Sequence, residues 1–185
     1  RVVCVAVMGA PICLLVGLTT VGLLPLVHAG ADSDRAGLQL RRPFLWAALA
    51  LIALAGATEI GMAQWLPAYA ERELGYGRDL GAMALAMFSV AMMVGRILLG
   101  FLLRHIPAVT LLLVCCAASI ALIALGAYLP CPPGALAACV VLGFVLATFW
   151  PTTLSLASDR FPRGGALMFG LLAAFGNFGC VAMPW

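Results

Sequence analysis

Long apolar runs separated by short polar stretches dominate the pattern of hydrophobic and polar positions along the chain. A helix of about 20 apolar residues crosses the ~30 Å hydrocarbon core of a bilayer. These runs lack the short polar/apolar alternation of barrel strands. We therefore expect an all-α, polytopic membrane helix bundle with six transmembrane helices, over Val2–His28, Pro43–Tyr69, Leu80–Leu103, Ala108–Leu129, Gly134–Ala157 and Ala166–Trp185.

Composition supports this interpretation. The chain is 65% hydrophobic and 9% charged, and its mean hydropathy is +1.15. A soluble domain has about 25% charged residues, so a soluble fold of this size could not hide so much apolar surface. The net charge of +3 is too small and too dispersed to indicate nucleic acid as a partner. The bilayer itself is the partner that composition predicts.

The polar stretches predict how the helices are connected and oriented. Residues 29–42 combine two glycines with several charges, which is typical of a flexible linker between two bundles. Cytoplasmic loops are enriched in basic residues. Loops 29–42, 104–107 and 158–165 hold six arginines, against two (Arg72 and Arg78) in the other two loops. We therefore expect these three loops in the cytoplasm of a multi-pass plasma-membrane protein, with the bacterial inner membrane as the setting.

Motifs for catalysis, metal binding and ATP use are absent from the sequence. The seven cysteines form no Cys-x-x-Cys pair, and the two histidines stand alone, so we expect no metal site. There is no phosphate-binding Walker loop and no Gly-x-Ser-x-Gly nucleophile motif. We therefore expect a protein that is not an enzyme and has no cofactor. Coupling to protons or to Na⁺ stays open.

Glu59 is the residue around which the functional hypothesis is built. It lies within an apolar segment, where a carboxylate costs about 3 kcal/mol on insertion scales. It either takes up and releases protons, or hydrogen-bonds a substrate hydroxyl, or locks helix packing. Intramembrane acids are functional by default, which favours the first two roles.

Arg96 is the second charge within the membrane. From the cytoplasmic helix ends, Glu59 lies about 22 Å deep and Arg96 about 12 Å deep. This offset of about 10 Å predicts that the two residues do not form a direct ion pair, and that exchanging their charges does not restore function. Arg96 either anchors a substrate, or closes a cytoplasmic gate, or snorkels to the interface.

Three further polar or aromatic residues are candidates for substrate contact. Gln64 and Trp65 follow Glu59 on the same helix, and Asn177 lies near the midplane of the last one. Asn177 either bonds substrate or joins helices. Tyr69 is placed where an aromatic belt at the membrane interface is ordinary.

Prolines and glycines mark candidate bends and close contacts. Pro67 and Pro151 each remove a backbone donor and allow a kink, which serves gating or is static. Gly95 and Gly100 favour tight helix contacts and are grouped with the prolines as gating candidates.

Three motifs together resemble the Major Facilitator Superfamily. Gly95–Pro107 is similar to the Gly-x-Leu-x-Asp-Arg-x-Gly loop of that family, with Arg104 in place of the aspartate and Pro107 in place of the last glycine. It matches the weaker copy of the loop, between the eighth and ninth helices. Phe149–Ala157 and Gly170–Trp185 resemble helices ten and eleven. The segment around Glu59, Trp65 and Pro67 is similar to the seventh helix of fucose-permease-like and sugar-transporter-like members.

The resemblance implies a domain arrangement and a function. Residues 1–28 would be the last helix of the N-terminal bundle, 29–42 the central cytoplasmic linker, and 43–185 a truncated C-terminal bundle of helices seven to eleven. The chain begins and ends within apolar runs, so we expect a fragment whose N-terminal bundle is missing. The implied function is secondary active transport of a small solute, sugar-like or another small organic molecule, by alternating access, as in a proton-coupled symporter. Alternatives are a transporter-like sensor or scaffold that binds without moving its ligand, and a drug-efflux member of the same superfamily.

Overall fold

The computed structural model describes residues 43–162 and 165–182, and all regular structure in these ranges is helical. The helix expected over Val2–His28 and the linker over 29–42 lie outside the described residues. The helices are α3 (Pro43–Arg72), α4 (Arg78–Leu102), α5 (Ala108–Tyr128), α6 (Pro132–Leu146), α7 (Phe149–Arg160) and α8 (Gly165–Ala182).

Four stretches of the described chain are long and apolar enough to cross a membrane. They are α3, α4, α5 and the combined stretch Pro132–Arg160, which contains α6 and α7. The apolar part of α8, Met168–Ala182, is shorter. A polytopic all-α bundle is thus confirmed. The described residues contain four long spans and one shorter apolar helix, and the first of the six expected spans lies outside them.

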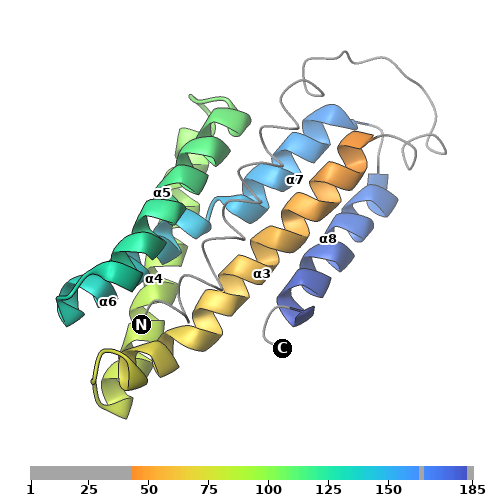
Figure 1. Ribbon diagram of the computed structural model, residues 1–185. Helices are drawn as coiled ribbons and strands as arrows, with labels where there is room; N and C mark the ends of the chain where they lie inside the picture. The colour runs from red at the N-terminus through yellow and green to blue at the C-terminus, as the bar shows by residue number, and fades with distance from the viewer. Residues whose placement is uncertain (1–42, 163–164, 183–185) are drawn as a thin grey trace.

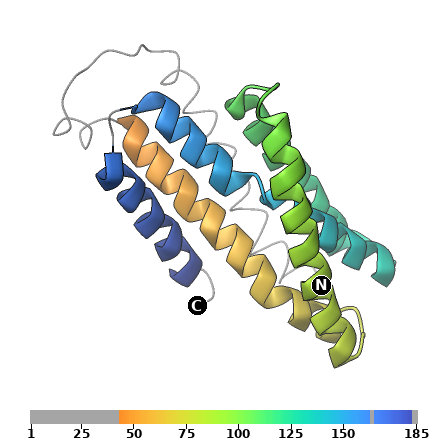
Figure 2. The ribbon, with the colours of Figure 1, turned by 180° about the vertical axis from the view of Figure 1, so that it is seen from behind.

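Helix α3 holds the central place in the bundle. It lies between α4 and α8 and also packs against α7 (Figures 1 and 2). Helix α6 packs against both α4 and α5, so α4, α5 and α6 form the other part of the bundle. Buried side chains such as Leu51, Ile52, Phe88 and Leu142 fill the space between these helices. Because α3 packs against α4, α7 and α8, a side chain in its middle, such as Glu59, can lie close to more than one helix.

The turn between α3 and α4 sets these two helices antiparallel. Helix α3 ends at Arg72, and three residues later Gly75 adopts a φ of 75°, a left-handed conformation that glycine accepts without a Cβ clash. The amide of Tyr76 donates to the carbonyl of Ala70 at 3.1 Å, which satisfies one of the free carbonyls at the helix end. The side chain of Leu74 is buried beneath the turn. This closure fixes the register between the helix of Glu59 and the helix of Arg96.

Small residues allow α8 to approach α3 at backbone distance. A Cβ on Gly56 would meet the carbonyl oxygen of Gly176 and the Sγ of Cys180. A Cβ on Gly179 would overlap the backbone of Ala53. Such contacts are the usual means of helix association in lipid, where apolar burial gives little driving force. Helix α8 is therefore held firmly against α3.

The two glycines of α4 differ in their surroundings. A Cβ on Gly95 would collide with the carbonyl of Phe144 in α6 and with Ala147. Apart from its chain neighbours and the backbone of its own helix, no described atom lies within 4 Å of the place where a Cβ on Gly100 would stand. The close contact expected from the sequence is thus present at Gly95, whereas at Gly100 the neighbouring space among the described residues is open.

The apolar run Gly134–Ala157 is not one continuous helix, contrary to the sequence expectation. Helix α6 ends at Leu146 and α7 begins at Phe149. The hydroxyl of Thr148 donates to the carbonyl of Val145 at 2.9 Å, so it competes for the backbone acceptor of the preceding turn. Pro151, four residues after Ala147, has no N–H to continue the ladder. The two effects coincide at residues 147–148 and interrupt the helix there.

Candidate functional site

Glu59 of α3 and Arg96 of α4 form an ion pair in the interior of their membrane-spanning helices. The Nη2 of Arg96 donates to the Oε1 of Glu59 at 2.6 Å. The side chain of Glu59 is 14% exposed, and that of Arg96 is 49% exposed. The pair therefore joins a mostly buried carboxylate to a guanidinium whose other edge is open.

This contact corrects the sequence expectation that Glu59 and Arg96 would have separate partners. The offset in depth refers to the backbone, whereas side chains on a helix incline toward its N-terminus. Because α3 and α4 run antiparallel, Glu59 inclines away from their shared turn and Arg96 inclines toward it. Arg96 starts farther from the turn than Glu59, so the two side chains converge. The long arginine stem spans the remaining distance.

Each member of the pair keeps hydrogen-bonding capacity beyond the pair itself. The Oε2 of Glu59 is buried and has no hydrogen-bond partner among the residues that the structure describes. Both described contacts of the Arg96 guanidinium use Nη2, the second being the thioether sulfur of Met92 at 3.6 Å. A guanidinium carries five N–H donors. The site can therefore both donate and accept hydrogen bonds toward a ligand.

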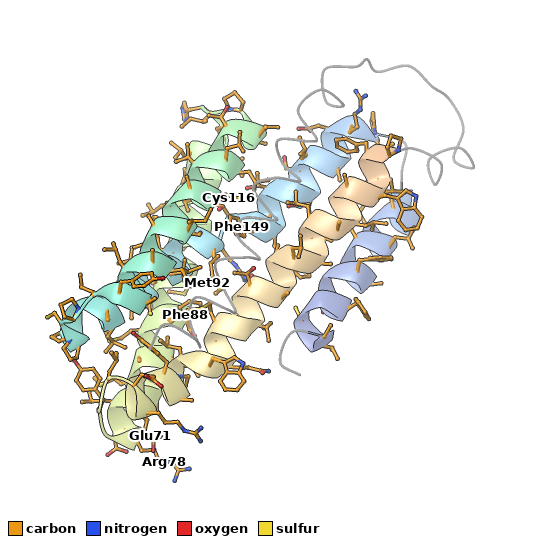
Figure 3. All side chains as sticks on the ribbon, in the orientation of Figure 1. Glu71, Arg78, Phe88, Met92, Cys116 and Phe149 are labelled. Carbon is orange, nitrogen blue, oxygen red and sulfur yellow. The ribbon has the colours of Figure 1, made fainter. Side chains whose placement is uncertain are left out.

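Apolar side chains continue from the pair into the bundle. Phe88, one turn before Met92 on α4, is buried against Gly143 of α6. Phe88, Met92, Phe149 and Cys116 follow one another along the bundle in this order, while Glu71 lies apart near the α3–α4 turn (Figure 3). The charged pair thus lies next to a packed apolar core, in surroundings that strengthen electrostatic interactions.

The structure does not bring the other proposed substrate contacts to the pair. Gln64 and Trp65, the latter 38% exposed, point away from the direction of Glu59, because five and six residues on a helix correspond to rotations of about 140° and 240°. Asn177 is exposed, and its amide donates to the carbonyl of Ala173 in its own helix at 2.9 Å. Substrate contact by these three residues stays a prediction.

The residues proposed for gating lie on three helices. Pro67 is inside the continuous helix α3, where its carbonyl lies next to Gly81 of α4. Gly95 is at the α4–α6 contact, Gly100 is one turn beyond Arg96, and Pro151 is near the start of α7. Their roles in gating stay predictions.

Sequence reasoning placed Tyr69 in an interfacial aromatic belt, and this placement is wrong. Tyr69 is only 5% exposed, and its hydroxyl donates to the carbonyl of Gly126 in α5. Residue 130, which would normally supply an amide to that carbonyl, is a proline. The spacing of Gly126 and Pro130 was the signal in the sequence that this carbonyl needs an outside donor.

Met92 was also missed as a neighbour of the pair. It lies four residues before Arg96 on α4, and i, i+4 neighbours share one face of a helix.

No group of three or more His, Cys, Asp or Glu side chains in residues 43–162 and 165–182 could hold a metal ion.

The family model described as Major Facilitator Superfamily matches residues 3–184. No curated protein and no solved structure shows a significant match to the chain. The family match gives no support to the sugar-transporter subgroup. Members of this family are multi-pass transmembrane transporters of small molecules and are not enzymes. Since the match covers nearly the entire sequence, the chain belongs to the Major Facilitator Superfamily.

Proposed function

We propose that the protein is a secondary active transporter that moves a small solute by alternating access, and that Glu59 and Arg96 line its translocation path. The observation that supports this proposal is the ion pair itself. It joins two membrane-spanning helices and leaves half of the arginine side chain exposed. In secondary transporters, substrate and coupling-ion sites lie near the middle of the membrane.

A purely structural role explains the pair less well. Helices α3 and α4 are already held in register by the short turn at residues 73–77. Apolar contacts and the close approach of Gly81 to Pro67 add to this. Partly buried ion pairs often contribute little net stability, because desolvation offsets the attraction. A costly pair that packing does not require is a good candidate for a functional group.

Gln64, Trp65 and Asn177 enter the proposal as secondary contacts. All three are exposed in this conformation, so they are accessible to a ligand or to another part of the protein. In an alternating-access cycle, helices change their relative positions, and a residue outside the site in one conformation can reach the substrate in another.

The test is uptake by the full-length protein reconstituted in liposomes. The panel contains sugars, organic anions and hydrophobic cations, and the variants are Glu59→Gln and Arg96→Gln. We expect both variants to lose at least about tenfold in uptake of the transported solute. The matched control is Glu71→Gln, which removes an exposed carboxylate at the α3–α4 turn and should leave uptake unchanged.

Two outcomes would contradict the proposal. Binding of a solute without uptake by the wild-type protein would favour the sensor or scaffold alternative. Full uptake by both Glu59→Gln and Arg96→Gln would show that the pair only supports packing. A third outcome would leave the transport function intact: extrusion of hydrophobic cations, without uptake of any other class, would assign the protein to drug efflux.

A further inference from the structure

We propose that the Glu59–Arg96 site takes a small organic anion, and that each anion binds together with one proton, which is carried by Glu59. This inference rests on the proposed transport function and names its substrate class and its coupling ion. It follows from the way in which the two side chains share their hydrogen-bonding capacity.

The open edge of Arg96 is suited to a carboxylate. Only Nη2 has described partners, and half of the side chain is exposed. Arginine stays charged at every relevant pH and presents parallel N–H groups that match the two oxygens of a carboxylate. A ligand carboxylate can therefore approach Arg96 from the side that Glu59 does not occupy.

Binding of an anion at the open edge weakens the attraction between Arg96 and Glu59, because two carboxylates then share the single positive charge of one guanidinium. Glu59 is mostly buried, and its Oε2 already has no partner in the described chain. A buried carboxylate whose counter-charge is neutralised by a second anion is strongly disfavoured in its ionised form. Glu59 therefore takes up a proton as the anion binds.

The charges balance in this exchange. Before binding, the carboxylate of Glu59 and the guanidinium of Arg96 sum to zero. After binding, the anion and Arg96 sum to zero and protonated Glu59 is neutral. The site never holds a net charge within the membrane, where a net charge is costly. One proton per monovalent anion is the stoichiometry that keeps this balance.

No other ionisable group facing Glu59 among the described residues could replace its role. Helix α4 contributes Arg96, and α8 contributes the thiol of Cys180, which packs near Gly56 one turn away. On α6 the ionisable side chain is Cys139, which contacts Gly126 of α5. On α7 the ionisable side chains are Asp159 and Arg160. Arg160 lies over the ring of Phe44, which is about four helical turns from Glu59 on α3.

The surroundings favour an organic anion over an inorganic one. Met92 contacts the guanidinium, and the exposed side chains of Met93 and Ile97 flank Arg96 on α4. Methionine offers flexible, polarisable apolar surface that adapts to different ligand shapes. A neutral sugar would bind with the ion pair intact, so it would take up no proton.

The decisive experiment is calorimetric titration of the purified full-length protein in detergent. The probes are monocarboxylates from acetate to benzoate, the corresponding amides, and glucose. Each titration is repeated in two buffers with different ionisation enthalpies, which gives the number of protons taken up per ligand. We expect carboxylates to bind at least about tenfold more tightly than their amides, with uptake of about one proton. Carboxylate affinity should fall by up to about tenfold for each unit of rising pH.

Variants separate the two roles. Glu59→Gln should bind carboxylates with no proton uptake and no dependence on pH, because glutamine imitates the protonated acid. Arg96→Gln should lose at least about tenfold in carboxylate affinity, while Arg96→Lys keeps part of it. Thermal unfolding of each variant confirms that it is folded.

Equal affinity for carboxylates and amides would overturn the proposal, as would proton uptake that persists in Glu59→Gln. Transport of a neutral solute by a protein that binds no carboxylate would also overturn it, while leaving the proposed transport function intact. Carboxylate binding with proton uptake but no transport of any solute would support the anion site and contradict the transport function.

Discussion

The Nη2 of Arg96 and the Oε1 of Glu59 lie 2.6 Å apart and join α4 to α3 within their membrane-spanning stretches. The contact exists because side chains on antiparallel helices incline in opposite directions. The contact therefore depends on the separation of α3 and α4, and not only on the position of either residue. A ligand can change this separation.

Exchange of the two charges should preserve the pair. Glu59→Arg and Arg96→Glu, made separately, place like charges together, and each should lower the free energy of unfolding by about 1–2 kcal/mol. This figure is modest because Arg96 is half exposed and water screens it. The double exchange should recover most of this loss in thermal unfolding in detergent. Additive losses in the double variant would show that the contact does not form in the protein.

The two glycines of α4 provide a matched pair of substitutions. Gly95→Ala places a methyl group against the carbonyl of Phe144 and should destabilise the protein by about 1–3 kcal/mol. Gly100→Ala meets open space and should be neutral or stabilise by about 0.5–1 kcal/mol through reduced backbone entropy. Unfolding temperatures of the two variants, measured side by side, test this expected difference in stability. A similar loss in both variants would contradict the packing described here.

The hydrogen bond from Tyr69 to Gly126 should be measurable in the same way. Tyr69→Phe leaves the carbonyl of Gly126 without this donor and should cost about 1–2 kcal/mol. Tyr128→Phe is the control, because the side chain of Tyr128 is exposed. If Tyr69→Phe unfolds at the wild-type temperature, another donor has replaced the hydroxyl.

Pro151 should influence the rate of transport more than stability. Pro151→Ala restores an amide that can bond to Ala147, so α6 and α7 can join into one helix. We expect an unchanged or higher unfolding temperature and a several-fold slower uptake in liposomes. Pro133→Ala is the control, since Pro133 lies in the first turn of α6, where proline is well tolerated. Unchanged uptake by Pro151→Ala would exclude the break from gating.

Within residues 43–162 the sequence predicted the membrane-spanning segments well and their internal geometry less well. The segment expected over Pro43–Tyr69 corresponds to α3, which continues to Arg72. Hydropathy reports the length that crosses lipid, whereas the helix itself continues to Arg72, three residues before Gly75 reverses the chain. The interruption at residues 147–148 was not expected, because it depends on a threonine hydroxyl and a proline acting together.

The candidate site was only half predictable. Glu59 and Arg96 stand out in the sequence as charges in apolar surroundings, and both form the ion pair of the candidate site. Backbone rise alone places the two residues at different depths and so predicts separate partners. Side-chain inclination, which sequence spacing does not show, reversed that result. Tyr69 was misplaced for a similar reason, since hydropathy does not distinguish a helix face toward lipid from a face toward α5.

The interruption between α6 and α7 divides one membrane span into two rods with different companions. Helix α6 packs mainly on α4 and α5, whereas α7 packs on α3 and α5. If the proposed transport cycle displaces α4 from α3, this packing predicts that the first rod moves with α4 and the second stays with α3. Residues 147–148 would then be the joint between the two rods. Separation of Glu59 from Arg96 would in this way change the angle within a span that contains neither residue.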